Sequence, residues 1–170
     1  DCKITSIYEG TDGIQAMDLL GRKLGMAKGQ VFINLLGEIQ KTVALAKETP
    51  GLEEIASDVA KGANRLGEVA MHLGANAMSA QFKVAFAAAF PFLEVMGDVI
   101  MAWMLLWRAV IAAQKLKGGA KKKEIDLYEG QIKTAEFFIY TILPTTLGKM
   151  NAIVKSNGSA VEISEAGFGG

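Results

Sequence analysis

The chain has 170 residues, no net charge at neutral pH and 51% hydrophobic residues, which is enough apolar material for one domain with a buried core. Its 18 basic residues balance its 18 acidic ones, which argues against non-specific nucleic-acid binding and against a polybasic membrane anchor. A single cysteine excludes an internal disulfide framework, and a single histidine argues against zinc, so we expect no metal site.

Apolar residues recur with helical spacing along most of the chain, and no strand pattern interrupts them. We predict helices over residues 13–24, 31–48, 52–73 and 81–116. Pro91 either kinks the fourth of these or marks a new first turn. A last helix begins near Lys121 and is kinked at Pro144, and the Ser/Gly-rich residues 157–170 are predicted to form a flexible tail.

The four long helical segments from residue 31 onward are antiparallel candidates joined by short connections, as a four-helix bundle requires. We therefore predict an all-α fold, a four-helix up-down bundle preceded by a short loop and a helix. This prediction rests on periodicity and on the scarcity of proline, of which the chain has three.

The most apolar stretch, residues 84–113, is interrupted by Glu94, Asp98 and Arg108. Its uncharged pieces are too short to cross a bilayer, so we predict a buried core helix and no membrane span. Because this helix is apolar nearly all round, we expect it to be central in the domain or covered by a partner subunit. The chain opens without a signal peptide and without Met, so we expect a cytoplasmic protein whose first residue lies inside a longer natural chain.

One segment, residues 7–15, combines features that suit chemistry. The carboxylate of Glu9 comes just before a helix, and Gly10 lets a ligand approach the backbone closely. The hydroxyl of Thr11 stands at a helix start, where free N–H groups suit a phosphate. A positioned Glu beside an anion site is a candidate general base. On spacing alone, an ordinary capped helix with an exposed Glu explains the same residues.

The segment Ile7-Tyr8-Glu9-Gly10-Thr11-Asp12-Gly13-Ile14-Gln15 closely resembles the motif near the end of the acyl-CoA dehydrogenase core, and its flanks, residues 1–5 and 18–23, resemble the flanks in that family. Residues 26–170 look like the additional C-terminal helical domain of some long bacterial members, notably at 126–130 and 134–138. The resemblance implies three regions: 1–25, the end of the dehydrogenase core; 26–156, a C-terminal helical bundle; and 157–170, the tail.

The resemblance also implies a reaction and roles for five residues. Glu9 would be the base that removes the α-proton of an acyl-CoA, while the β-hydrogen leaves as hydride to the flavin of FAD, giving a trans-2-enoyl-CoA. Gly10 would contact the substrate. The FAD contacts would come from Thr11, Asp12 and Gly13. Family members usually carry Asn at the position of Asp12, so the resemblance implies that this chain would place a negative charge near the cofactor phosphates.

The implied partners are the acyl-CoA substrate, an electron-transfer flavoprotein, the remainder of the dehydrogenase core and further copies of the chain in a homo-oligomer. Because most of that core is absent from these 170 residues, we predict that they alone neither hold FAD tightly nor turn over substrate. The alternative is a non-catalytic helical assembly or interaction domain that buries the apolar surface around Trp103. The two hypotheses are compatible.

Two further motifs have ordinary explanations. Tyr128-Glu129-Gly130 has the same three residue types as Tyr8-Glu9-Gly10 of the candidate motif. It lies in mid-helix and is not followed by Thr, so we do not assign it to catalysis. The run Lys121-Lys122-Lys123 is interpreted as a solvated helix start, although cations suit that end of a helix dipole poorly. An anionic partner is the alternative interpretation of the three lysines.

Overall fold

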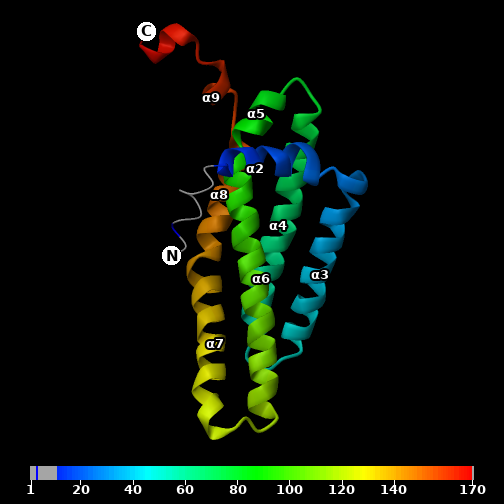
Figure 1. Cartoon of the computed structure of the whole chain (residues 1–170), viewed down its shortest axis with the longest axis vertical. Coiled ribbons are helices and arrows are strands. Elements are labelled where there is room, and N and C mark those ends of the chain that lie inside the picture. The colour runs from blue at the N-terminus through cyan, green and yellow to red at the C-terminus, as the bar shows by residue number, and fades with distance from the viewer. Residues whose placement is uncertain (1–2, 4–10, 170) are drawn as a thin grey trace.

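The computed structural model describes residue 3 and residues 11–169, whose regular elements are all helices (Figure 1). The described elements are α2 (Asp12–Asp18), η1 (Leu19–Lys23), η2 (Met26–Gly29), α3 (Gln30–Lys47), α4 (Glu53–Ala77), α5 (Phe82–Ala87), α6 (Ala89–Lys117), α7 (Lys122–Thr141), α8 (Leu143–Lys155), α9 (Ser159–Glu162) and η3 (Glu165–Phe168). No strand occurs in this part of the chain, and the predicted all-α class is confirmed.

Helix α6 lies in the middle of the molecule and packs against α3, α4, α7 and α8 (Figure 1). Its apolar residues face several neighbours at once, because Phe92, Val95 and Val99 are fully buried along with small residues such as Ala102 and Ala109. The central position, which was one of the two predicted alternatives, is therefore confirmed. It follows from a sequence that is apolar on nearly every side.

The segment predicted as one helix over 81–116 is two helices, α5 and α6, separated at Ala88. Pro91 therefore lies in the first turn of α6, where its missing N–H removes no helical hydrogen bond, and it produces no kink within the helix. This settles the alternative that the sequence left open.

The last predicted helix, which begins near Lys121, is interrupted at Ile142, two residues before Pro144. The chain continues beyond this point as α8. The interruption lets α7 follow α6 while α8 packs against both α4 and α6. Close packing at this junction depends on Gly62 of α4, since a Cβ atom there would lie 3.1 Å from Cδ1 of Leu143.

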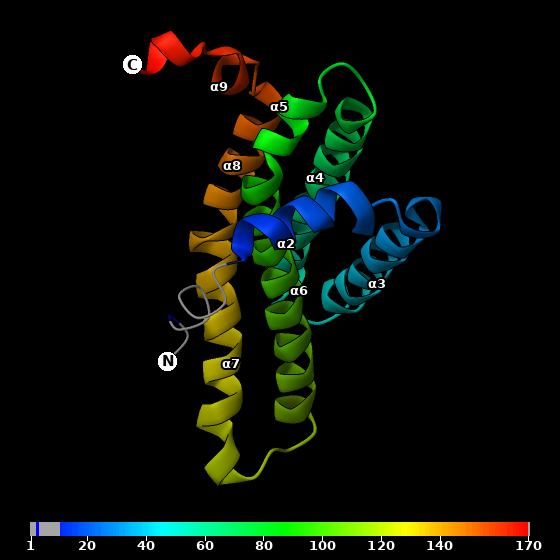
Figure 2. The same cartoon turned by 45° about the horizontal axis from the view of Figure 1, so that its top comes forward.

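The helix predicted over residues 13–24 differs from the one observed. Helix α2 ends at Asp18 and continues as the π-helical turn η1, which ends at Lys23. A tight connection to α3 follows, in which Ala27 and Lys28 both adopt positive φ. Figure 2 shows α2 lying across the front of α6, and the two helices are in contact.

The residues predicted as a tail contain the short segments α9 and η3, which extend beyond the bundle (Figure 1). Helix α9 contacts α5. The predicted flexibility of this region stays a prediction.

Two helical stretches in the described part of the chain are long and apolar enough to cross a membrane by length and composition, namely α6 and residues 122–155. In their most apolar windows, 44% and 28% of the residues are buried within the bundle. A central core helix such as α6 meets the same criteria. The absence of a membrane span stays a prediction.

Two side-chain hydrogen bonds connect α6 to its neighbours. The hydroxyl of Thr146 in α8 donates to Oδ2 of Asp98 at 2.8 Å, and Thr146 is fully buried. On another side of α6, Nε1 of Trp103 donates to Oγ1 of Thr42 in α3 at 2.8 Å. Because a buried polar group is costly without its partner, these bonds favour one register of α6 against α3 and α8.

Replacing Thr146 by Val keeps the shape of the side chain but removes the donor to Asp98. We expect the free energy of unfolding to fall by about 1.5–3 kcal/mol, the usual range for a hydrogen bond to a charged group, as measured by denaturant titration. The neighbouring Thr145 is exposed and bonds only to the Ile142 carbonyl, so Thr145→Val is the control and should change stability by less than about 0.5 kcal/mol. Equal losses in the two variants would contradict a role for the Asp98 bond.

Candidate functional site

Three of the five predicted site residues, Thr11, Asp12 and Gly13, lie at the start of α2. The other two, Glu9 and Gly10, lie outside the described residues. The described part of the site is therefore the side predicted to contact FAD. The predicted base and substrate contact stay predictions.

Thr11 occupies the N-cap position of α2, yet its side chain makes no capping hydrogen bond. Its Oγ1 atom is buried and has no hydrogen-bond partner among the described residues. A buried hydroxyl without a partner is energetically unfavourable. The hydroxyl thus fits a group that supplies the missing partner, such as a bound polar ligand.

Asp12 and Gly13 are exposed in the first turn of α2. No atom lies within 4 Å of the position that a Cβ at Gly13 would take, so the backbone there is open to a ligand. The Asp12 carboxylate suits the positive end of the helix dipole but would repel a phosphate brought to the same place. Thr11 and Gly13 therefore fit a phosphate-bearing cofactor such as FAD, whereas Asp12 opposes one.

The bundle holds this helix through its inner face. Ala16, Leu19 and Leu20 are buried where α2 and η1 meet the core formed around α6. The lack of a side chain at Gly21 allows η1 to approach α5, since a Cβ there would lie 3.3 Å from Cζ of Phe86. The start of α2 is thus positioned by packing several residues further along the chain.

An ion pair stabilises the junction between α2 and η1. Nε and Nη2 of Arg22 donate to the two carboxylate oxygens of Asp18 at 2.7 and 2.8 Å. Lys23 contributes a longer contact of 3.3 Å to Oδ2. The hydrogen bond from Arg22 lowers the pKa of Asp18 below its usual value, although the carboxylate is only partly shielded from water. The i,i+4 spacing of Asp18 and Arg22 is the sequence signal of this pair.

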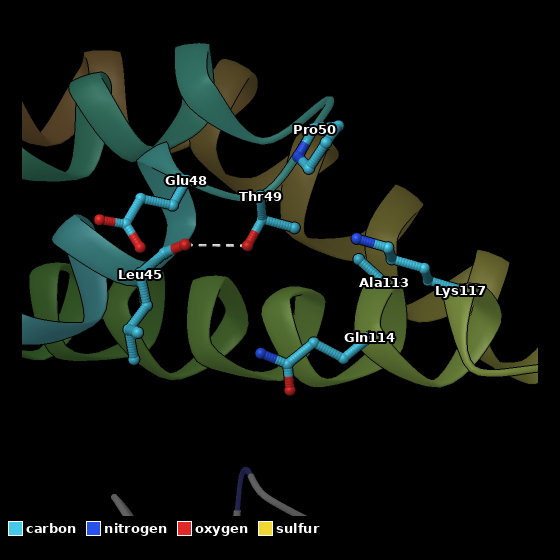
Figure 3. Close-up of a pocket in the computed structure, with 7 residues that line it drawn as sticks. All are labelled: Leu45, Glu48, Thr49, Pro50, Ala113, Gln114 and Lys117. Carbon is cyan, nitrogen blue, oxygen red and sulfur yellow. Dashed lines mark hydrogen bonds between the residues drawn. The ribbon is translucent and has the colours of Figure 1, made fainter.

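A shallow hollow of about 440 Å³ lies at the far end of the bundle from α2, where α3 ends beside the second half of α6 (Figures 1 and 3). Its lining residues are Leu45, Glu48, Thr49, Pro50, Ala113, Gln114 and Lys117. The Thr49 hydroxyl is already used, because it donates to the Leu45 carbonyl at 2.8 Å. The hollow therefore does not extend the site at α2.

No group of three or more His, Cys, Asp or Glu residues able to hold a metal ion occurs within the described part of the chain. The expectation of no metal site stays a prediction, since residues 4–10 are not described.

Comparison with known proteins identifies the family. Residues 35–164 match the family described as acetyl-CoA dehydrogenase C-terminal like. The chain belongs to the acyl-CoA dehydrogenase family. The matched residues cover most of the helical bundle, from within α3 to α9.

Several relatives are acyl-CoA dehydrogenases by name. The chain is 32% identical to a broad-specificity linear acyl-CoA dehydrogenase of Mycobacterium tuberculosis over 99% of its own length and 28% of the relative's. It is 29% identical to a butyryl-CoA dehydrogenase of Syntrophomonas wolfei, over 99% and 27%. It is 30% identical to a 3-methylmercaptopropionyl-CoA dehydrogenase of Ruegeria pomeroyi, over 96% and 27%. The acyl-CoA dehydrogenase segment thus spans little more than a quarter of the length of these relatives.

The Asp18–Arg22 pair predicts a pH effect of defined sign. A carboxyl whose pKa is lowered by folding stabilises the native state above its unfolded pKa, and this contribution is lost as the pH falls through the lower, folded pKa. We therefore expect the melting temperature to fall less steeply below about pH 4 in Asp18→Asn than in the wild type. The difference should be small, because the pair is exposed.

Thermal unfolding monitored by circular dichroism between about pH 2 and 6 measures this difference. The control is Asp126→Asn, since Asp126 is exposed and takes part in no ion pair of the described part of the chain. The control should follow the wild-type curve. If Asp18→Asn followed it too, the ion pair would have no role in acid stability.

Proposed function

We propose that this chain is the C-terminal part of an FAD-dependent acyl-CoA dehydrogenase that oxidises an acyl-CoA to a trans-2-enoyl-CoA. The observation that carries the proposal is the similarity to named acyl-CoA dehydrogenases over as much as 99% of the chain. An alignment of that extent takes in the region of residues 7–15, where the predicted site lies.

Glu9 is the proposed base. The thioester carbonyl acidifies the α-hydrogen of the acyl group, and a carboxylate within hydrogen-bond reach takes that proton as the β-hydrogen leaves with its electron pair. FAD, when bound, supplies the hydride acceptor. Gly10 carries no side chain and lets the substrate approach the backbone beside the base.

The start of α2 is the proposed cofactor contact. The Thr11 hydroxyl, buried and without a partner among the described residues, supplies a hydrogen bond to the cofactor, and Gly13 leaves room beside it. Asp12 places a carboxylate where relatives of this type usually carry an amide, so it weakens the attraction for a phosphate. The bundle orients these residues by burying Ala16, Leu19 and Leu20.

The rest of the enzyme completes this proposal. The remainder of the dehydrogenase core supplies most of the flavin and acyl pocket, an electron-transfer flavoprotein takes the electrons, and the enzyme works as a cytoplasmic homo-oligomer. The 170 residues alone are inactive on this proposal, because the chain covers 27–28% of the length of its relatives.

A second proposal, compatible with the first, is that the bundle is an assembly domain. The observation that favours it is the apolar outer surface of α2 and α6, where Ile14, Met17 and Met101 are exposed. Large apolar side chains exposed on two helices that contact each other are consistent with a surface that another protein or domain covers. The surface would be covered by the remainder of the dehydrogenase or by another subunit.

The proposed base can be tested in the full-length enzyme by anaerobic titration with acyl-CoAs. Bleaching of the flavin absorbance reports reduction, and Glu9→Gln should slow it by about 10²–10⁴-fold, the range for loss of a general base. Glu129→Gln is the matched control, because Glu129 is exposed in α7 and Tyr128-Glu129-Gly130 repeats the Tyr-Glu-Gly sequence of residues 8–10. A parent without flavin, or equal bleaching with and without Glu9, would refute the proposal.

Asp12 provides a separate test of the cofactor contact. If its carboxylate faces the phosphates of FAD, Asp12→Asn removes a repulsion and should lower the dissociation constant of FAD by about two- to five-fold, since an exposed charge pair contributes up to about 1 kcal/mol. Quenching of FAD fluorescence by the flavin-free enzyme measures this constant. The charge-matched control Asp126→Asn should leave it unchanged. No change in Asp12→Asn would place this residue away from the cofactor.

A further inference from the structure

The balanced net charge conceals an uneven distribution of charges along the chain. Between residues 108 and 123 there are six cations and no acid: Arg108, Lys115, Lys117, Lys121, Lys122 and Lys123. None of the six takes part in an ion pair within the described residues, whereas other cations, such as Arg22, Lys61 and Lys133, do. We call residues 108–123 the basic segment.

The basic segment lies at the end of a helical hairpin that projects from the bundle. The last turns of α6 and the first turns of α7 extend past the connection between α3 and α4 in both views (Figures 1 and 2). No residue from 114 to 134 is buried. The two helices of the hairpin pack mainly on each other there, through half-buried residues such as Leu116, Ile125 and Tyr128. The cations are therefore free to approach an external surface.

Large apolar side chains are exposed on the same hairpin. Trp107 is 47% exposed, Ile111 43% and Leu127 58%. Trp107, Ile111 and Lys115 follow one another at intervals of four residues and so share one face of α6. The Trp107 ring stacks on that of Trp103, with centroids 6.3 Å apart and planes inclined by 11°, which holds it in place. A face that mixes tryptophan, aliphatic residues and cations is typical of helices that lie at a membrane interface.

The charges suit an extended anionic surface better than a single compact anion. Lysine is a point charge on a flexible stem and lacks the fixed fork with which arginine grips one phosphate. The hollow next to the basic segment includes Lys117 but also Glu48, whose carboxylate opposes a small anion (Figure 3). In addition, three of the lysines lie at the start of α7, where the helix dipole disfavours cations. This local disadvantage is offset if negative charge faces the hairpin.

We propose that the hairpin of residues 107–127, in which the six cations outnumber the two acids Glu124 and Asp126, is a peripheral docking surface for an anionic lipid bilayer. The cations face the lipid head groups, while Trp107, Ile111 and Leu127 enter the boundary between head groups and acyl chains. Each cation near an anionic membrane contributes about five-fold to the partition coefficient. This inference goes beyond acyl-CoA oxidation, and its test does not depend on that activity.

The test is co-sedimentation of the full-length protein with lipid vesicles at low salt. We expect binding to phosphatidylcholine vesicles that contain about one-third phosphatidylglycerol, no binding to pure phosphatidylcholine, and release at about 0.5 M NaCl. Lys122→Glu combined with Lys123→Glu should lower the partition coefficient by at least about 25-fold. Replacing Trp107 by Phe should remove most of the blue shift of tryptophan emission that accompanies binding.

The matched control reverses two other unpaired, exposed lysines of the described part of the chain, Lys83→Glu with Lys155→Glu, which lie at the opposite end of the bundle. It changes the net charge equally and should bind like the wild type. The expected loss of vesicle binding cannot be explained by unfolding of the Lys122→Glu, Lys123→Glu variant. Both substitutions place negative charge at the start of α7, which suits the helix dipole, so the melting temperature should be equal or higher. Equal binding of both double variants, or equal binding to neutral vesicles, would overturn the proposal. Lysine-dependent retention on immobilised polyglutamate without vesicle binding would also overturn it and would indicate an acidic protein partner.

Discussion

The packing of α6 against its neighbours is the constraint on which the rest of the molecule depends. A helix that is apolar on nearly every side cannot remain in water, so α3, α4, α7 and α8 surround much of it. The hydrogen bonds from Thr146 to Asp98 and from Trp103 to Thr42 then favour one register of α6, whereas purely apolar contacts would tolerate sliding. Helix α2 is positioned in turn, because its buried face lies on α6.

In this arrangement the predicted site and the bundle that supports it come from different parts of the chain. The residues predicted to act on cofactor and substrate come from a short stretch near the start of the chain, whereas the bundle of more than 100 residues that follows contributes no residue to that predicted site. Ala16 is buried one turn beyond Gly13 and fixes the start of α2 against the bundle. This packing holds the Thr11 hydroxyl and the open backbone at Gly13 in a constant position. The bundle therefore acts on the site through the position of α2.

Sequence periodicity predicted most of the helices, because amphipathic spacing reports directly which face is buried. The central place of α6 was also predictable from its apolar composition. The division at Ala88, the π-helical turn η1 and the positive φ of Ala27 and Lys28 were not, since tertiary packing rather than local preference determines the backbone there. Within the site, the sequence placed Thr11 at the start of a helix. That its hydroxyl is buried without a partner among the described residues depends on packing that no spacing rule specifies.

The hairpin formed by α6 and α7 has a consequence for how such domains diversify. Because no side chain between residues 114 and 134 is buried, adding or removing paired helical turns there leaves the core packing unchanged. The length of the hairpin can therefore change during evolution without a change in the packing that stabilises the bundle. Related chains can differ in how far this arm extends while keeping the same bundle and the same support for α2.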